Sequence, residues 1–218
     1  MVRNTKWLVA GLASLAMLGC HEVGPGDEGT QLSEARAEGA LAWREDFNAA
    51  LVDWEFPVGT WSRQTEAGDG VLTQTATEEV YPLAIWKKPG LRDLDLSVRF
   101  RPISGKIDAS GGLVFRARDA LNYYVVRANS LEGNFRLYAV RAGHRVQIAS
   151  VEVTPPSLGE WHTLRVVAVA DHIQAYLDGR LLLEHDDDEF DQGYVGLWTK
   201  ADAVTAFDDL RVEARSNP

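Results

Sequence analysis

Apolar and polar residues alternate with a period of two along the chain after residue 43, and this pattern predicts β-strands rather than helices. The clearest alternation lies in 94–100 (LDLSVRF) and 173–177 (IQAYL). Further strand-like runs occupy 112–118, 123–127, 135–140 and 161–167. Turn signals separate these runs at intervals of roughly 8–12 residues, the spacing of sandwiches and barrels. No amphipathic helix is predicted after residue 43.

The strongest turn signal is Asp178-Gly179, which lies between two strand-like runs. An Asp-Gly pair favours a type I′ hairpin, because that turn needs a positive φ at both central residues. Ala142-Gly143 and Gly68-Asp69-Gly70 are further candidate turns. At this length, many short strands predict an all-β jelly-roll β-sandwich of two antiparallel sheets over residues 43–218.

The N-terminal segment differs from this pattern. Arg3 and Lys6 precede a mostly apolar run over 7–19, and the run ends at Cys20, the only cysteine of the chain. A charged start, a short apolar run and a small-residue boundary are the features of a secretory signal peptide. The run is shorter than the roughly 20 residues that span a bilayer. Met17-Leu18-Gly19-Cys20 also resembles a bacterial lipobox, so we expect residues 1–19 to be removed and Cys20 to be lipidated.

The lipid on Cys20 would then attach the protein to a membrane in the cell envelope. Residues 20–42 carry few apolar side chains to bury, and we expect a flexible tether there. His21 stands where the resemblance would place an aspartate for inner-membrane retention, so the outer membrane is favoured over the inner. Lipidation uses the only thiol, so the domain must be stable without a disulfide.

The charge of the chain excludes one class of partner. The formal net charge is −10, and the 22 basic side chains include Arg3 and Lys6, so the mature chain has 20 basic against 32 acidic side chains, a net charge near −12. Such a surface repels phosphate backbones, and we expect no nucleic-acid binding. We expect the domain to act as a monomer.

The order of several segments resembles the concanavalin A-like lectin/glucanase superfamily. More narrowly, it resembles laminin-G-like domains and the 3-keto-disaccharide hydrolase (family-16-glycosidase-like) domains of bacterial lipoproteins. The resemblance covers residues 43–213 and implies fold more strongly than activity. The segments that carry it are 111–116 (GGLVFR), 122–129 (NYYVVRAN), 159–165 (GEWHTLR), 177–179 (LDG), 193–200 (GYVGLWTK) and 207–210 (FDDL).

Carbohydrate binding is the function that these residues favour, since sugars offer apolar ring faces to aromatic side chains and hydroxyl groups to polar ones. If Leu113 and Phe115 face the core, alternation places neighbouring polar and aromatic side chains on one outward sheet face, with two more at its rim. The predicted carbohydrate-binding residues are Arg116, Arg118, Tyr123, Arg127, Trp198 and Lys200, with Asn129 and Asp202 at the rim. A register error of one residue would move all of them to the other face.

An enzyme is the first alternative, because the resemblance also implies a hydrolase or lyase acting on glycosides or 3-keto-glycosides. Glu184, Asp186 and Glu189 match the ExDxxE pattern of family-16 glucanases. The intervening positions are charged or polar rather than apolar, however, so we interpret this segment as a loop without a catalytic role. No catalytic residue is assigned. The second alternative is an envelope module that binds protein without catalysis.

A structural calcium ion is a further expectation. Lectin and glucanase jelly rolls often hold calcium between their first and last strands, and the matching positions are Asp46, Asp208 and Asp209. Calcium needs 6–8 oxygen ligands, many of them carboxylates. Binding would stabilise a domain that has no disulfide.

Overall fold

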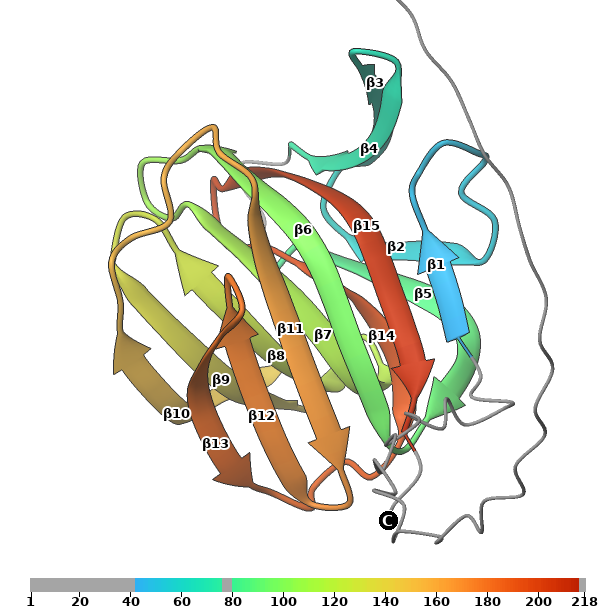
Figure 1. The fold of residues 1–218 in the computed structure, drawn as a ribbon, viewed down its shortest axis with the longest axis vertical. Coiled ribbons are helices and arrows are strands. Elements are labelled where there is room, and N and C mark those ends of the chain that lie inside the picture. The colour runs from blue at the N-terminus through green and yellow to red at the C-terminus, as the bar shows by residue number, and fades with distance from the viewer. Residues whose placement is uncertain (1–41, 76–79, 216–218) are drawn as a thin grey trace, which may run out of the picture. The chain divides into compact units, whose positions relative to one another are not determined.

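Two antiparallel sheets lie face to face in the computed structural model, which describes residues 42–75 and 80–215 (Figure 1). The signal segment, Cys20 and the tether lie outside the described residues. Every element of the described residues is a strand, so the expected all-β jelly-roll sandwich is confirmed. No helix within the two described ranges is long and apolar enough to cross a membrane.

The eight-stranded sheet has the order β13-β12-β11-β6-β15-β4-β3, and β1 pairs with β15 beside this path. Its strands are β1 (Ala42–Glu45), β3 (Trp61–Glu66), β4 (Asp69–Gln74), β6 (Leu94–Ser104), β11 (His162–Val169), β12 (His172–Leu177), β13 (Arg180–Asp186) and β15 (Val204–Ala214).

The seven-stranded sheet has the order β10-β9-β8-β7-β14-β5-β2. Its strands are β2 (Trp54–Val58), β5 (Leu83–Leu91), β7 (Ser110–Asp119), β8 (Asn122–Asn129), β9 (Asn134–Arg141), β10 (His144–Glu152) and β14 (Gly193–Trp198).

The two sheets differ in how their outer faces meet solvent. In β6, Leu94, Leu96, Val98 and Phe100 point into the core, and the residues between them are partly exposed. This alternation is typical of a sheet with one solvated face. Strands β7 and β8 are buried along nearly their whole length, because a second apolar cluster covers the outer face of the seven-stranded sheet.

The hairpin between β12 and β13 confirms the turn predicted at Asp178-Gly179. The two residues have φ values of 49° and 78°, and Leu177 pairs with Arg180 across the turn. Positive φ at both central residues is the requirement of the type I′ turn. The Asp178 carboxylate also accepts a hydrogen bond from the backbone N–H of Thr163 at 2.8 Å. The turn is thereby tied to the neighbouring strand β11.

Candidate functional site

The outer face of the seven-stranded sheet gathers most of the polar and aromatic side chains that alternation predicted to lie together. Trp198 on β14 pairs in register with Gly112 on β7. Gly112 pairs with Arg127 on β8, and Arg127 pairs with Arg136 on β9. Because Gly112 has no side chain, the Trp198 ring can lie directly over the β7 backbone. Tyr123 lies in the same outer cluster.

Five residues form what we call the arginine–tyrosine cluster: Arg127, Glu132, Arg136, Tyr138 and Arg145. The Tyr138 hydroxyl accepts hydrogen bonds from Nη2 of Arg127 at 3.3 Å and Nη1 of Arg136 at 3.5 Å. Cζ of Arg145 lies 4.3 Å from the Tyr138 ring centroid. Oε2 of Glu132 accepts from Nη2 of Arg127 at 3.0 Å and lies 3.4 Å from Nη1 of Arg136.

Aromatic rings border this cluster. Cζ of Arg145 also lies 4.8 Å from the Tyr81 ring centroid and 5.5 Å from that of Trp198. The rings of Tyr81 and Trp198 stack on each other with their centroids 5.5 Å apart. Burial raises the pKa of Tyr123 to about 12. Trp198 is 0% exposed and Tyr123 2%, so these two predicted binding residues lie under the outer face rather than on its surface. Of the three rings only that of Tyr81 is partly exposed beside the hydrogen-bond donors of the cluster.

Several guanidinium donors of the cluster lack partners. Within the described part of the chain, Nε and Nη1 of Arg127 and Nη1 of Arg145 are buried and have no hydrogen-bond partner. The Arg127 side chain is only 1% exposed. A buried polar group without a partner costs free energy, and such groups call for an explanation such as a ligand. The unpartnered donors therefore mark this face as a candidate binding site.

The carboxylate of Glu132 stays ionised over the whole physiological range. Burial raises its pKa, but hydrogen bonds from Asn134 and Arg127 and the nearby charges of Arg127 and Lys200 outweigh burial and lower it to about 2. Glu132 therefore acts as a fixed anion that orients guanidinium groups.

A pH-dependent contribution to stability follows from this pKa. The pKa of Glu132 is about 2 in the folded state against an ordinary value of 4.5, so its contribution is present above pH 4.5 and is lost as pH falls toward 2. Between pH 4.5 and pH 2 we expect the Glu132→Gln variant to lose less free energy of unfolding than the wild type. The difference should be about 1 kcal/mol after allowance for the partial exposure of Glu132. Urea unfolding at pH 7, 4 and 2.5 measures the difference. Equal pH slopes for the two proteins would contradict the prediction.

Lys200 and Asn129 meet at one end of the face through a buried carboxylate. Oδ2 of Asp108 accepts hydrogen bonds from Nζ of Lys200 at 3.1 Å and Nδ2 of Asn129 at 2.9 Å. The Asp202 carboxylate accepts hydrogen bonds from the backbone N–H groups of residues 106–108. Asn129 and Asp202 thus hold loops in place, and Lys200 remains partly exposed beside Glu132.

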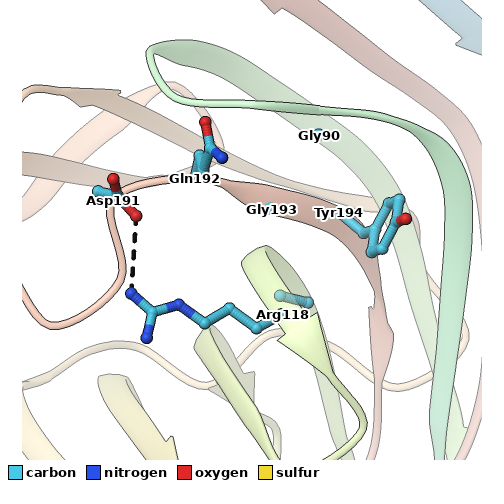
Figure 2. A pocket seen from close by; sticks show the side chains of 7 residues that line it. Gly90, Arg118, Asp191, Gln192, Gly193 and Tyr194 are labelled. Carbon is cyan, nitrogen blue, oxygen red and sulfur yellow. Dashed lines mark ion pairs between the residues drawn. The ribbon is translucent and has the colours of Figure 1, made fainter.

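Arg118 lies away from the arginine–tyrosine cluster, in a pocket of about 360 Å³ at the other end of the sheet (Figure 2). Its guanidinium lies 3.6 Å from the Asp191 carboxylate. The pocket is also lined by Gln192 and Tyr194, and Nζ of Lys87 lies 4.0 Å from the centre of the Tyr194 ring. Tyr194 packs against the outer apolar cluster, so this pocket borders the same face of the sheet.

The expectation that Arg116 and Arg118 point outward together is wrong. A β-bulge lies between Phe115 and Asp119, and Arg116 within it has a φ of 49°. The extra residue breaks the alternation and turns the Arg116 side chain into the protein, where it is 0% exposed. Its guanidinium donates hydrogen bonds to the backbone carbonyls of residues 92, 170 and 190. Arg116 therefore ties three turns together and cannot reach a ligand on the outer face.

The structure does not support the predicted calcium site. Oδ1 of Asp209 lies 2.7 Å from Nη2 of Arg44, and Oδ2 lies 3.3 Å from Nη1 of Arg99. Asp46 accepts a hydrogen bond from the Asn48 backbone instead. No group of three metal-binding side chains occurs among residues 42–75 and 80–215. Arginine charges occupy the place that the cation was expected to take, so these residues do not fit a calcium ion.

The interpretation of the ExDxxE segment as a loop is wrong for its first half: Glu184 and Asp186 lie on β13 of the eight-stranded sheet, and only Glu189 follows in the loop. Glu184 accepts a hydrogen bond from Gln174 at 2.8 Å. Oε2 of Glu189 lies 3.0 Å from Nε of Arg141. Glu184 and Asp186 also share His172, at 3.6 Å and 2.7 Å. The two glutamates of the pattern thus have separate partners, His172 and Gln174 for Glu184 and Arg141 for Glu189.

Sequence reasoning missed Tyr81, Glu132, Arg136, Tyr138 and Arg145. Arg136 and Tyr138 alternate within the predicted strand 135–140, so pairing this strand beside 123–127 would have placed them near Arg127. Tyr81 and Glu132 lie outside the strands, and Arg145 lies on a strand that the pattern did not predict. Periodicity therefore carried no signal for these three residues.

Comparisons with known proteins agree with this architecture. The family model described as the 3-keto-alpha-glucoside-1,2-lyase-like domain matches residues 42–213. The chain is 24% identical over 177 residues to the levanase of Bacillus subtilis, covering 77% of this chain but only 24% of the levanase. Among solved structures, the carbohydrate binding module CBM66 from Bacillus subtilis is similar with a TM-score of 0.64 and 21% identity, over 74% of this chain and 96% of that module. A β-glucanase of Bacillus licheniformis has a TM-score of 0.56 and 12% identity, over 80% and 98% of the two chains.

Proposed function

Because the chain belongs to the 3-keto-alpha-glucoside-1,2-lyase-like domain family, we propose that it is a carbohydrate-binding β-sandwich whose ligand lies on the outer face of the seven-stranded sheet. The observation that carries this proposal is the set of unpartnered guanidinium donors of Arg127 and Arg145 beside the rings of Tyr81, Tyr138 and Trp198. Arginine forks bind oxygen groups, and aromatic rings pack against the apolar faces of sugars.

The face has room for more than one sugar unit. Trp198 and Tyr194 lie on the same side of β14 and are four residues apart, which corresponds to about 13 Å along a strand. Trp198 adjoins the arginine–tyrosine cluster, and Tyr194 lines the pocket that contains Arg118. Trp198 is 0% exposed and packs against Tyr81 and Arg145, so we propose that an extended oligosaccharide contacts Tyr81 and Arg145 at one end and Tyr194 at the other.

A screen of the purified chain against a panel of glycans tests the proposal, with binding and cleavage scored on the same samples. We expect saturable binding of at least one oligosaccharide without release of product. The absence of binding to every glycan would contradict the proposal and favour the alternative of an envelope module that binds protein.

The family description makes a lyase or hydrolase the second candidate, and the carboxylates of the face argue against it. A general acid at neutral pH needs a raised pKa, whereas the pKa of Glu132 is about 2 and Asp108 is paired with Lys200. Release of product in the same screen, lost in the Glu132→Gln variant, would establish an enzyme instead.

We further propose that the protein is exported and anchored in the cell envelope, most favourably the outer membrane, by lipid on Cys20. The support is the sequence of residues 1–20 alone. We expect metabolic labelling with radioactive palmitate to mark the wild-type chain in a bacterial host and not the Cys20→Ser variant, which would accumulate unprocessed. Equal labelling of the two proteins, or labelling of neither, would contradict the anchor.

A further inference from the structure

The arginine–tyrosine cluster carries an excess of positive charge in a protein that is otherwise acidic. Arg127, Arg136 and Arg145 all contact Tyr138, at the hydroxyl or over the ring. Within ranges 42–75 and 80–215, Glu132 is the one carboxylate that contacts them, and it is shared between Arg127 and Arg136. Among the described residues, no carboxylate lies within 4.0 Å of the Arg145 guanidinium. In the part of the chain that the structure describes, these three cations therefore contact one anion, although the chain as a whole has a net charge of −10.

Of the other charges nearby, Glu152 acts on Arg136 from beyond ion-pair distance and reduces this imbalance without removing it. Lys200 adds a fourth cation, and Asp108 neutralises it at a distance of 3.1 Å. The effect of the excess is visible at Tyr138: burial raises its pKa, but the charge of Arg127 and the hydrogen bonds from Arg136 and Arg127 outweigh burial and lower it. Like charges held together at a poorly solvated site repel one another more strongly than they do in water.

We propose that the ligand is an acidic sugar, whose anionic group binds between the guanidinium groups of Arg127, Arg136 and Arg145. This inference rests on the proposed function and names the class of sugar. A carboxylate or sulfate would accept from the unpartnered Nε and Nη1 of Arg127 and Nη1 of Arg145, and it would complete the charge balance of the cluster. Arginine is suited to this role because its planar fork matches both anions.

The neighbouring rings determine where the rest of the ligand lies. Tyr81 is partly exposed beside Arg145 and stacks on the buried ring of Trp198, so the Tyr81 ring can pack against the sugar ring that carries the anion. A bare phosphate or a nucleic-acid backbone would make no use of these rings, and the acidic remainder of the surface would repel a long polyanion. The combination of aromatic rings and excess cations therefore favours an acidic oligosaccharide.

Matched glycans test the charge directly. Isothermal titration of the full chain would compare two matched pairs of glycans. The first pair is oligogalacturonides and their methyl esters, which have the same sugars without the charge. The second pair is sulfated and unsulfated galactan oligosaccharides. We expect at least tenfold tighter binding of one acidic member than of its neutral partner, and the pair that shows it identifies the anion as carboxylate or sulfate. Raising NaCl from 0.1 to 0.5 M should reduce the difference, because salt screens charges.

Variants locate the anion. Arg136→Gln and Arg145→Gln should each reduce the preference for the acidic glycan by fivefold or more. Both side chains are partly exposed, so both variants should fold, which thermal unfolding would verify. Arg180→Gln makes the same change of charge on β13 of the other sheet and should leave the preference unchanged.

The outcomes separate this inference from the proposed function. Equal affinity for acidic and neutral partners would overturn the acidic-sugar inference and leave carbohydrate binding standing. A preference that survives in both cluster variants would also overturn it, since the anion would then bind elsewhere. Failure to bind any glycan in this set or in the wider screen would overturn both.

Discussion

Replacing Arg127 by methionine is expected to weaken glycan binding by about 100-fold or more. Nε and Nη1 of Arg127 are buried and have no partner in the described part of the chain, so a ligand that displaces the side chains above them could accept from both. Each hydrogen bond from a charged donor contributes about 1.5–3 kcal/mol, and the loss of two corresponds to at least that factor in affinity. Isothermal titration with the best glycan from the screen measures the loss.

A second substitution separates charge from geometry at this position. Arg127→Lys keeps the positive charge but lacks the planar fork, so we expect about tenfold weaker binding rather than complete loss. Arg165→Met is the matched control, because Arg165 forms a two-bond ion pair with Asp95 on the eight-stranded sheet, with N···O distances of 2.7 and 2.6 Å. This control should keep its affinity. Binding by the Arg127→Met variant within threefold of the wild type, with its fold intact, would show that the ligand lies elsewhere.

The sequence predicted the fold class well, because one solvated face leaves a period of two in the residue pattern. Strand β6 shows this alternation over its whole core-facing length. The order of strands within each sheet could not be derived in the same way. Strand β14, for example, lies between β7 and β5, and such long-range pairings leave no local periodicity. The second buried face of β7 and β8 further obscured the inward and outward positions there.

The candidate site was predictable only where alternation continued without interruption. Tyr123 and Arg127 share a face of β8 as predicted, and Trp198 joins them through the register of β14, β7 and β8. The bulge at Arg116 shifted one side chain from the surface to the interior, and nothing in the neighbouring sequence marked it. Arg145 came to the cluster from β10, whose pairing with β9 brings it opposite Val140. The alternation of apolar and polar residues could not have shown the contact between Arg145 and Tyr138.

Replacing Arg116 by methionine is expected to cost about 3–5 kcal/mol of folding free energy, the largest effect on stability that we predict. The guanidinium lies 3.0 Å from the carbonyl oxygen of Arg92, 2.7 Å from that of Ala170 and 3.3 Å from that of Phe190. Methionine keeps much of the volume but leaves one buried carbonyl and two part-buried ones without the guanidinium donor, and an orphaned buried acceptor costs about 1–3 kcal/mol. A loss of this size corresponds to a fall in melting temperature of about 6–20 °C.

Arg118→Met is the control two residues along the same strand. The Arg118 side chain is 54% exposed and lies in the open pocket, so its loss should change the free energy of unfolding by less than about 1 kcal/mol. Chemical unfolding of the three proteins compares them directly. Because Arg116 holds turns at the end of the sandwich rather than the ligand face, its variant should still bind glycan below its own melting temperature. Equal stability of the Arg116→Met and Arg118→Met variants would show that the three carbonyls find other donors. If the Arg116→Met variant were as stable as the wild type but no longer bound glycan, Arg116 would belong to the binding site after all.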